Sequence, residues 1–146
     1  MRAATRGALS AFSITGLAAA ALVGVPATAN ATPPSGVTGE ILWQKTVGDT
    51  DIVYRKITIQ PGGTTGWHFH DGNLLARVAE GTLDHFGSDC KSDGHYPKGS
   101  VFREPDHQVH IGRNLTGKPI VLLVYYFNPK GAPLSEDAAN PGCSFQ

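Results

Sequence analysis

Hydrophobic and polar positions alternate in short runs over most of the chain, and glycine or proline separates one run from the next. The run at residues 51–60 is rich in β-branched residues and alternates in its second half. Such runs predict β-strands, and no stretch after residue 31 carries the long hydrophobic stripe of a helix. Short strands at this spacing predict one β-sandwich or β-barrel. The predicted strands cover residues 39–47, 51–60, 64–70, 74–79, 82–86, 100–103, 108–112 and 119–127.

The last predicted strand is apolar on both of its alternating faces, because residues 120–127 read IVLLVYYF. A strand with one face in water would not have this pattern. Either another segment of the chain or a second subunit therefore covers the outer face. We favour a place in the core of one chain, and a homodimer is the alternative.

The first 31 residues have the three-part pattern of a secretory signal peptide. Arg2 and Arg6 precede an apolar stretch, and Ala29-Asn30-Ala31 offers a small-residue cleavage site. A transmembrane anchor is the alternative, but Ser, Thr and Gly interrupt the stretch and no basic cluster follows it. We therefore expect a secreted, extracellular protein without membrane attachment after cleavage. Residues 32–36 would form a flexible tail and residues 37–146 a single domain.

The composition is that of one small globular domain. The sequence has 146 residues, of which 40% are hydrophobic and 16% charged, and its formal net charge is zero. Loss of residues 1–31 would remove two arginines and no acidic residue, so the net charge would become −2. This balance excludes a strongly basic nucleic-acid-binding protein, and we expect no nucleic-acid partner.

Two cysteines, Cys90 and Cys143, are the only ones in the sequence. An even number of cysteines in an exported chain predicts a disulfide bond. The bond would join the C-terminal segment to the polar stretch at residues 87–99, which we expect to be a loop.

The histidines are the main candidates for chemistry. His68 and His70 are two positions apart on a predicted strand, so their side chains point to the same face and could bind one metal ion. The spacing is weak evidence when it stands alone. The six histidines are His68, His70, His85, His95, His107 and His110.

Two spaced motifs resemble those of the cupin superfamily. In the first, Gly62 is followed after five residues by His68-Phe69-His70, then by Leu74 and by Gly81. In the second, the equivalent positions are Gly99, Pro105, His110 and Asn114, while His107 stands where the family has a glycine. The resemblance covers residues 37–130 and implies an all-β fold, a single jelly-roll β-barrel with few or no helices.

The resemblance implies metal ligands at His68, His70 and His110. Leu74 stands where the family has a glutamate ligand, so we expect three histidines and an additional open coordination position. Another residue would have to replace that carboxylate. Strand alternation disfavours Asp71 and a turn disfavours Glu80, while His107 is a candidate for a fourth ligand or a base. His85 and His95 are expected at the surface.

The implied cofactor is a divalent transition metal, and Fe, Zn, Cu, Ni and Mn all remain candidates. One hypothesis is a dioxygenase-like or other small-molecule enzyme, for which His107 is a weak catalytic candidate. The other is a non-catalytic module that binds a metal or a small ligand; vestigial histidines are a third interpretation. In either of the first two, alternation from the ligand strand predicts a partly apolar pocket lined by Leu74, Ala76 and Val78.

Overall fold

The structure is a computed structural model that describes residues 31–146. The predicted signal peptide at residues 1–31 therefore lies outside the described residues except for its last residue, and it stays a prediction. Within the described part of the chain, no helix is long and apolar enough to cross a membrane.

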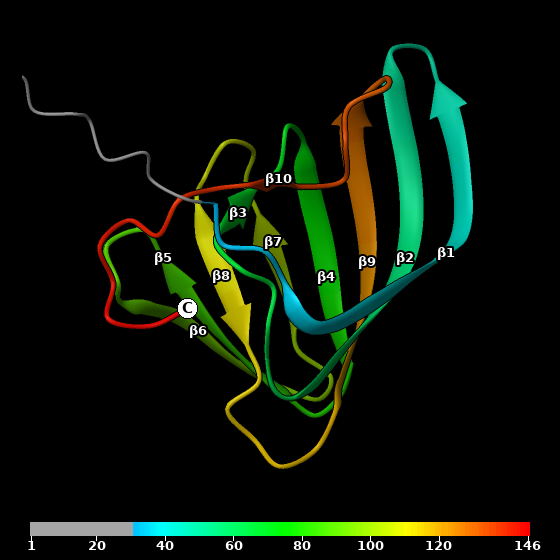
Figure 1. Cartoon of the computed structure of the whole chain (residues 1–146). Helices are drawn as coiled ribbons and strands as arrows, with labels where there is room; N and C mark the ends of the chain where they lie inside the picture. Colours follow the sequence, from blue (N-terminus) through cyan, green and yellow to red (C-terminus); the bar gives the residue numbers. More distant parts are fainter. Residues whose placement is uncertain (1–30) are drawn as a thin grey trace, which may run out of the picture.

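The described residues form ten strands, and all of their pairings are antiparallel (Figure 1). They are β1 (Ser35–Val47), β2 (Thr50–Thr64), β3 (His68–Phe69), β4 (Asn73–Glu80), β5 (Thr82–Gly87), β6 (Ser92–Pro97), β7 (Val101–Glu104), β8 (His110–Arg113), β9 (Ile120–Pro129) and β10 (Glu136–Asp137).

The strands form one nearly closed barrel. Figure 1 shows β1, β2, β9 and β4 side by side as a curved wall, with β8, β5 and β6 opposite. The pairing runs from β6 through β5, β8, β2, β9 and β4 to β7, so β6 and β7 are the two ends of the ladder. This is the all-β jelly-roll barrel that the sequence predicts.

Strand alternation explains where the core lies. In β4 the side chains of Leu74, Ala76 and Val78 are buried while the residues between them face outward. In β9 the same alternation buries every second residue from Ile120 onward. Burying one face of each strand removes a continuous apolar surface from water, which is the main favourable term in folding.

The outer face of β9 is only partly covered by its own chain. Tyr125 and Phe127 are 40% and 43% exposed, and the ring of Tyr125 stacks on Tyr54 of β2. Core burial therefore accounts for one face of the apolar run, and not for the other. A homodimer through this outer face stays a prediction.

Two expectations about irregular segments are wrong. The stretch at 87–99 contains β6, which pairs with β5, because residues 92–97 complete a hairpin after the turn. The expected tail at 32–36 is anchored, since Thr32 is 4% exposed. Its amide donates to the carbonyl of Ala138, and its hydroxyl accepts a hydrogen bond from the amide of Trp67.

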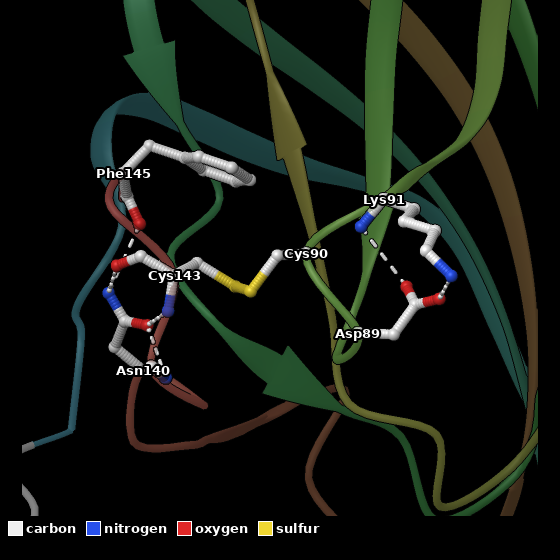
Figure 2. Close-up of a disulfide and its surroundings, with 7 residues drawn as sticks. Asp89, Cys90, Lys91, Asn140, Cys143 and Phe145 are labelled. Atoms are coloured by element: carbon white, nitrogen blue, oxygen red, sulfur yellow. Dashed lines mark hydrogen bonds and ion pairs between the residues drawn. A yellow bond between two sulfur atoms is a disulfide. The ribbon is translucent and has the colours of Figure 1, made fainter.

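The structure contains the disulfide bond between Cys90 and Cys143, with 5.4 Å between the two Cα atoms (Figure 2). Cys90 lies in the turn between β5 and β6, and Cys143 lies in the C-terminal segment. The side chain of Asn140 supports this segment through hydrogen bonds with the main chain of Cys143 and Phe145. The bond thus fastens the end of the chain to one hairpin of the barrel.

Candidate metal centre

The structure brings His68, His70 and His110 together inside one end of the barrel. His68 on β3 is directly paired with His110 on β8, so the two side chains share one face of the sheet. The three ring centroids lie 4.4–5.2 Å apart. All three side chains are buried, with His70 only 2% exposed.

A fourth group, Glu104, joins these histidines, and sequence reasoning missed it. Glu104 on β7 is the direct cross-strand partner of Leu74 on β4, the position where the cupin motif has its glutamate. Directly opposite residues project from the same face of a sheet. The carboxylate therefore reaches the site from the neighbouring strand, which corrects the expectation of a site made of three histidines alone.

The sequence held a weak signal for Glu104. It directly precedes Pro105 of the second motif, and it lies two positions after Phe102, whose side chain is buried. Strand alternation therefore points Glu104 inward with Phe102. An acidic residue that points inward beside a motif is a candidate metal ligand, and Glu104 meets both conditions.

Each histidine of the cluster is oriented by a main-chain carbonyl. The Nδ1 atoms of His68, His70 and His110 lie 2.9, 2.6 and 2.7 Å from the carbonyl oxygens of Gly66, Leu134 and Gln108, respectively. A carbonyl can only accept, so each Nδ1 carries the proton, and a neutral ring then has its lone pair on Nε2. Metal-binding histidines are typically held in this way.

Four potential ligand atoms converge at one place in the barrel. Glu104 Oε2 lies 3.1 Å from both His70 Nε2 and His110 Nε2, so one carboxylate oxygen faces the ring nitrogens that the main-chain carbonyls leave free. His110 Nε2 is buried and makes no hydrogen bond. The four ligand atoms lie within 4.8 Å of one another. The cluster of His68, His70, Glu104 and His110 could therefore hold a metal ion.

The electrostatics of the site favour the forms that bind a metal. Burial, followed by the charges of His110 and His70, lowers the pKa of His68 to about 3, which keeps this ring neutral. Burial acts to raise the pKa of Glu104, but His110, His70 and His85 outweigh it and hold the pKa well below its ordinary value. Glu104 is therefore ionised. A neutral imidazole and a carboxylate are the protonation states that coordinate a cation.

His85 is buried next to the cluster, so its expected surface position is wrong. The side chain on β5 points into the barrel and is 5% exposed. Its Nε2 lies 3.1 Å from Glu104 Oε1, and its Nδ1 lies 2.5 Å from Asp93 Oδ1. Burial opposes protonation of this ring, but the two carboxylates outweigh it and raise the pKa of His85 to about 9.

The other candidates lie outside the cluster. His107 has a side chain that is 66% exposed, and its Nε2 is 3.7 Å from Asp71 Oδ1. Its φ of 56° is in the left-handed region, which lets its amide donate to the carbonyl of His70. Glu80 is exposed, and His95 is exposed as expected. None of Asp71, Glu80 and His107 replaces the missing glutamate.

Two cavities meet at Glu104. A cleft of about 630 Å³ opens to the surface, and a second cavity of about 40 Å³ lies inside the barrel. His85 and Glu104 line both of them. Leu74 and Ala76 line the inner cavity, whereas Val78 is buried in the core and does not line it. The cleft is lined by His85, Asp93, Arg103, Glu104, His107 and His110, among others.

The barrel and its inward-facing histidines define a protein with the cupin fold. Among solved structures, the polyketide cyclase RemF from Streptomyces resistomycificus is similar, with a TM-score of 0.59, 22% identity and coverage of 75% of this chain and 78% of that one. A cupin-2 domain protein from Rhodospirillum rubrum is similar with a TM-score of 0.57 and 13% identity, and the match covers 71% of this chain and 66% of that one. A cupin superfamily protein from Desulfitobacterium hafniense is similar with a TM-score of 0.52 and 14% identity, and the match covers 63% of this chain and 77% of that one. No family model and no curated sequence matches the chain.

Proposed function

We propose that this protein is a secreted cupin that binds one divalent transition metal through His68, His70, His110 and Glu104. The observation that carries the proposal is the arrangement of Glu104 Oε2, 3.1 Å from two histidine Nε2 atoms whose Nδ1 atoms are already used by carbonyls. Nitrogen and carboxylate ligands suit Fe, Zn, Cu, Ni and Mn, so the ligand set leaves the identity of the metal open.

A small molecule in the cleft is the proposed ligand of this centre. Glu104 and His110 face the cleft, whose volume of about 630 Å³ is typical of a site for a small ligand. A bound metal would supply Lewis-acid or oxygen-activating chemistry to a group placed beside it. The chain's own residues would bind and orient that group, and His107 at the exposed rim is the candidate base.

Export is the other part of the proposal. The signal-peptide pattern of residues 1–31 motivates it, and the disulfide bond between Cys90 and Cys143 is compatible with an oxidising compartment. Expression of the full chain followed by N-terminal sequencing of the secreted product tests it. A mature protein that starts at residue 32 supports export, and retention of the intact chain in the cell contradicts it.

Elemental analysis of protein purified without a metal-chelating tag tests the metal site. We expect about one metal ion per chain, and loss of most of it in His68→Ala. His95→Ala is the matched control, because His95 is an exposed histidine that also hydrogen-bonds to a carboxylate. Equal metal content in the wild type, His68→Ala and His95→Ala would contradict the proposal.

A non-catalytic metal-binding module is the second candidate. The observation that favours it is the inner cavity of about 40 Å³, which has room for roughly one water molecule and for no substrate. An open coordination position separates the two functions. Azide should change the absorption spectrum of the Co²⁺-loaded protein if a position faces the cleft. An unchanged spectrum, with no turnover of small-molecule substrates, would support the binding module.

A further inference from the structure

A buried histidine outside both sequence motifs links Glu104 to a second acid. His85 on β5 contacts Glu104 with one ring nitrogen and Asp93 on β6 with the other. The side chain of Asp93 is 52% exposed at the cleft, while that of Glu104 is 12% exposed. The row of Asp93, His85 and Glu104 therefore runs from the cleft to the metal cluster.

The two carboxylate oxygens of Glu104 have separate partners. Oε1 lies 3.1 Å from His85 Nε2, whereas Oε2 lies 3.1 Å from the Nε2 atoms of His70 and His110. A carboxylate only accepts hydrogen bonds, so the ring of His85 donates to Oε1. A glutamate has three rotatable side-chain bonds, and this contact fixes the outermost one. His85 thereby fixes the orientation of the carboxylate, which turns one oxygen toward His85 and the other toward His70 and His110.

We propose that Asp93 and His85 are a positioning pair that presents Glu104 to the metal through a single carboxylate oxygen. The inference rests on the metal site of the proposed function. Asp93 holds the ring of His85, and the ring holds Oε1 of Glu104. His85 lies outside the group of four residues whose ligand atoms lie within 4.8 Å of one another, and its two nitrogens contact Asp93 and Glu104. Loss of such an outer partner typically weakens metal binding about 10–100-fold.

The variant His85→Phe removes both hydrogen bonds and keeps a ring beside Tyr96 and Phe102, which already contact His85. Chelator competition on the metal-free protein measures the Kd for Zn²⁺, and the Co²⁺-loaded protein gives an absorption spectrum that reports the ligand set. We expect a Kd about 10–100-fold higher and a changed Co²⁺ spectrum.

His95→Phe is the matched control. His95 Nδ1 lies 2.7 Å from Asp84 Oδ1, so β5 and β6 carry a second histidine–aspartate pair of the same chemistry. The side chain of His95 is 68% exposed and lies outside the cluster. The Kd and the spectrum of this variant should equal those of the wild type. A loss of affinity equal to that of His85→Phe would overturn the specific role of His85.

Two further variants separate positioning from simple packing. His85→Gln keeps an amide donor for Glu104 Oε1, so its Kd should lie less than about tenfold above the wild-type value. Asp93→Ala changes a half-exposed side chain and leaves the core unchanged. It therefore tests the positioning role even if His85→Phe does not fold. It should weaken binding and change the spectrum in the same direction as His85→Phe.

The results of these experiments distinguish the inference from the proposed function. If the wild type binds Zn²⁺ and Asp93→Ala binds it with an unchanged Kd and spectrum, the positioning role is overturned and the metal site stands. If the wild type binds no metal, the proposed function fails first.

Discussion

The carboxylate of Glu104 should determine how tightly the cluster holds a metal ion, and Glu104→Gln tests this at nearly constant volume. Glutamine keeps an oxygen that can accept the hydrogen bond from His85 Nε2. It removes the negative charge that lies 3.1 Å from the Nε2 atoms of His70 and His110. Loss of a charged ligand should exceed the loss of an outer partner, so we expect binding at least about 100-fold weaker.

This loss of affinity has a measurable effect on thermal stability. A metal ion present at 100 times its Kd stabilises the folded protein by about 2.7 kcal/mol. At the same free concentration, a variant with 100-fold weaker binding would gain only about 0.4 kcal/mol. In a domain of this size, 1 kcal/mol changes Tm by roughly 4 °C. The metal-induced rise in Tm should therefore fall from roughly 11 °C to below roughly 2 °C.

Calorimetry with and without Zn²⁺ measures this rise for each variant. Each protein is compared with its own metal-free form, so a change in intrinsic stability cancels. Glu80→Gln is the control, because Glu80 is an exposed glutamate at the end of β4 outside the cluster. It should keep the full metal-induced rise. If Glu104→Gln also kept the full rise, Glu104 would not be a ligand.

Three more predictions follow from the described residues. Replacing Cys90 and Cys143 by serine should lower the free energy of unfolding by up to about 4 kcal/mol, measured by urea titration, because the bond closes a loop across 53 positions; an unchanged urea midpoint would refute this. The pKa of His68 is about 3 when folded and 6.5 when unfolded, so the metal-free protein should lose up to about 5 kcal/mol as pH falls from 6.5 to 3. Unfolding titrations at several pH values should show that the stability of His68→Gln depends less on pH than that of the wild type. Asn114→Ala should cost about 2–3 kcal/mol in the same assay, because its buried amide donates to two main-chain carbonyls; a loss under about 0.5 kcal/mol would contradict that role.

Most of the barrel could be predicted from the sequence, because strand alternation and turn residues are local signals. The strand at 73–80 follows the pattern in its clearest form, with Leu74, Ala76 and Val78 inward. The two strands that were missed lack such a pattern. β6 consists mostly of polar residues, and β10 has two exposed residues held by pairing with β3. Long-range pairing, and not local propensity, makes these strands.

The histidines of the cluster were accessible to sequence reasoning, whereas their neighbours were not. His68 and His110 stand at motif positions with fixed spacing. His85 has no such position, and its burial depends on two acids from other strands, Asp93 and Glu104. A histidine outside both motifs is expected at the surface unless its partners are known, since burying an unpaired polar group is unfavourable.

The pairing of Leu74 with Glu104 explains how a motif that lacks its glutamate still brings a carboxylate to the three histidines. A motif records spacing along one strand, but ligands meet across the sheet, and these two residues are direct partners on β4 and β7. In this arrangement the apolar side chain of Leu74 faces the inner cavity of about 40 Å³. Glu104 also lines the cleft of about 630 Å³. The same arrangement brings the acid within reach of His85 on β5. The carboxylate of Glu104 is therefore open to both cavities, of which the cleft reaches the surface.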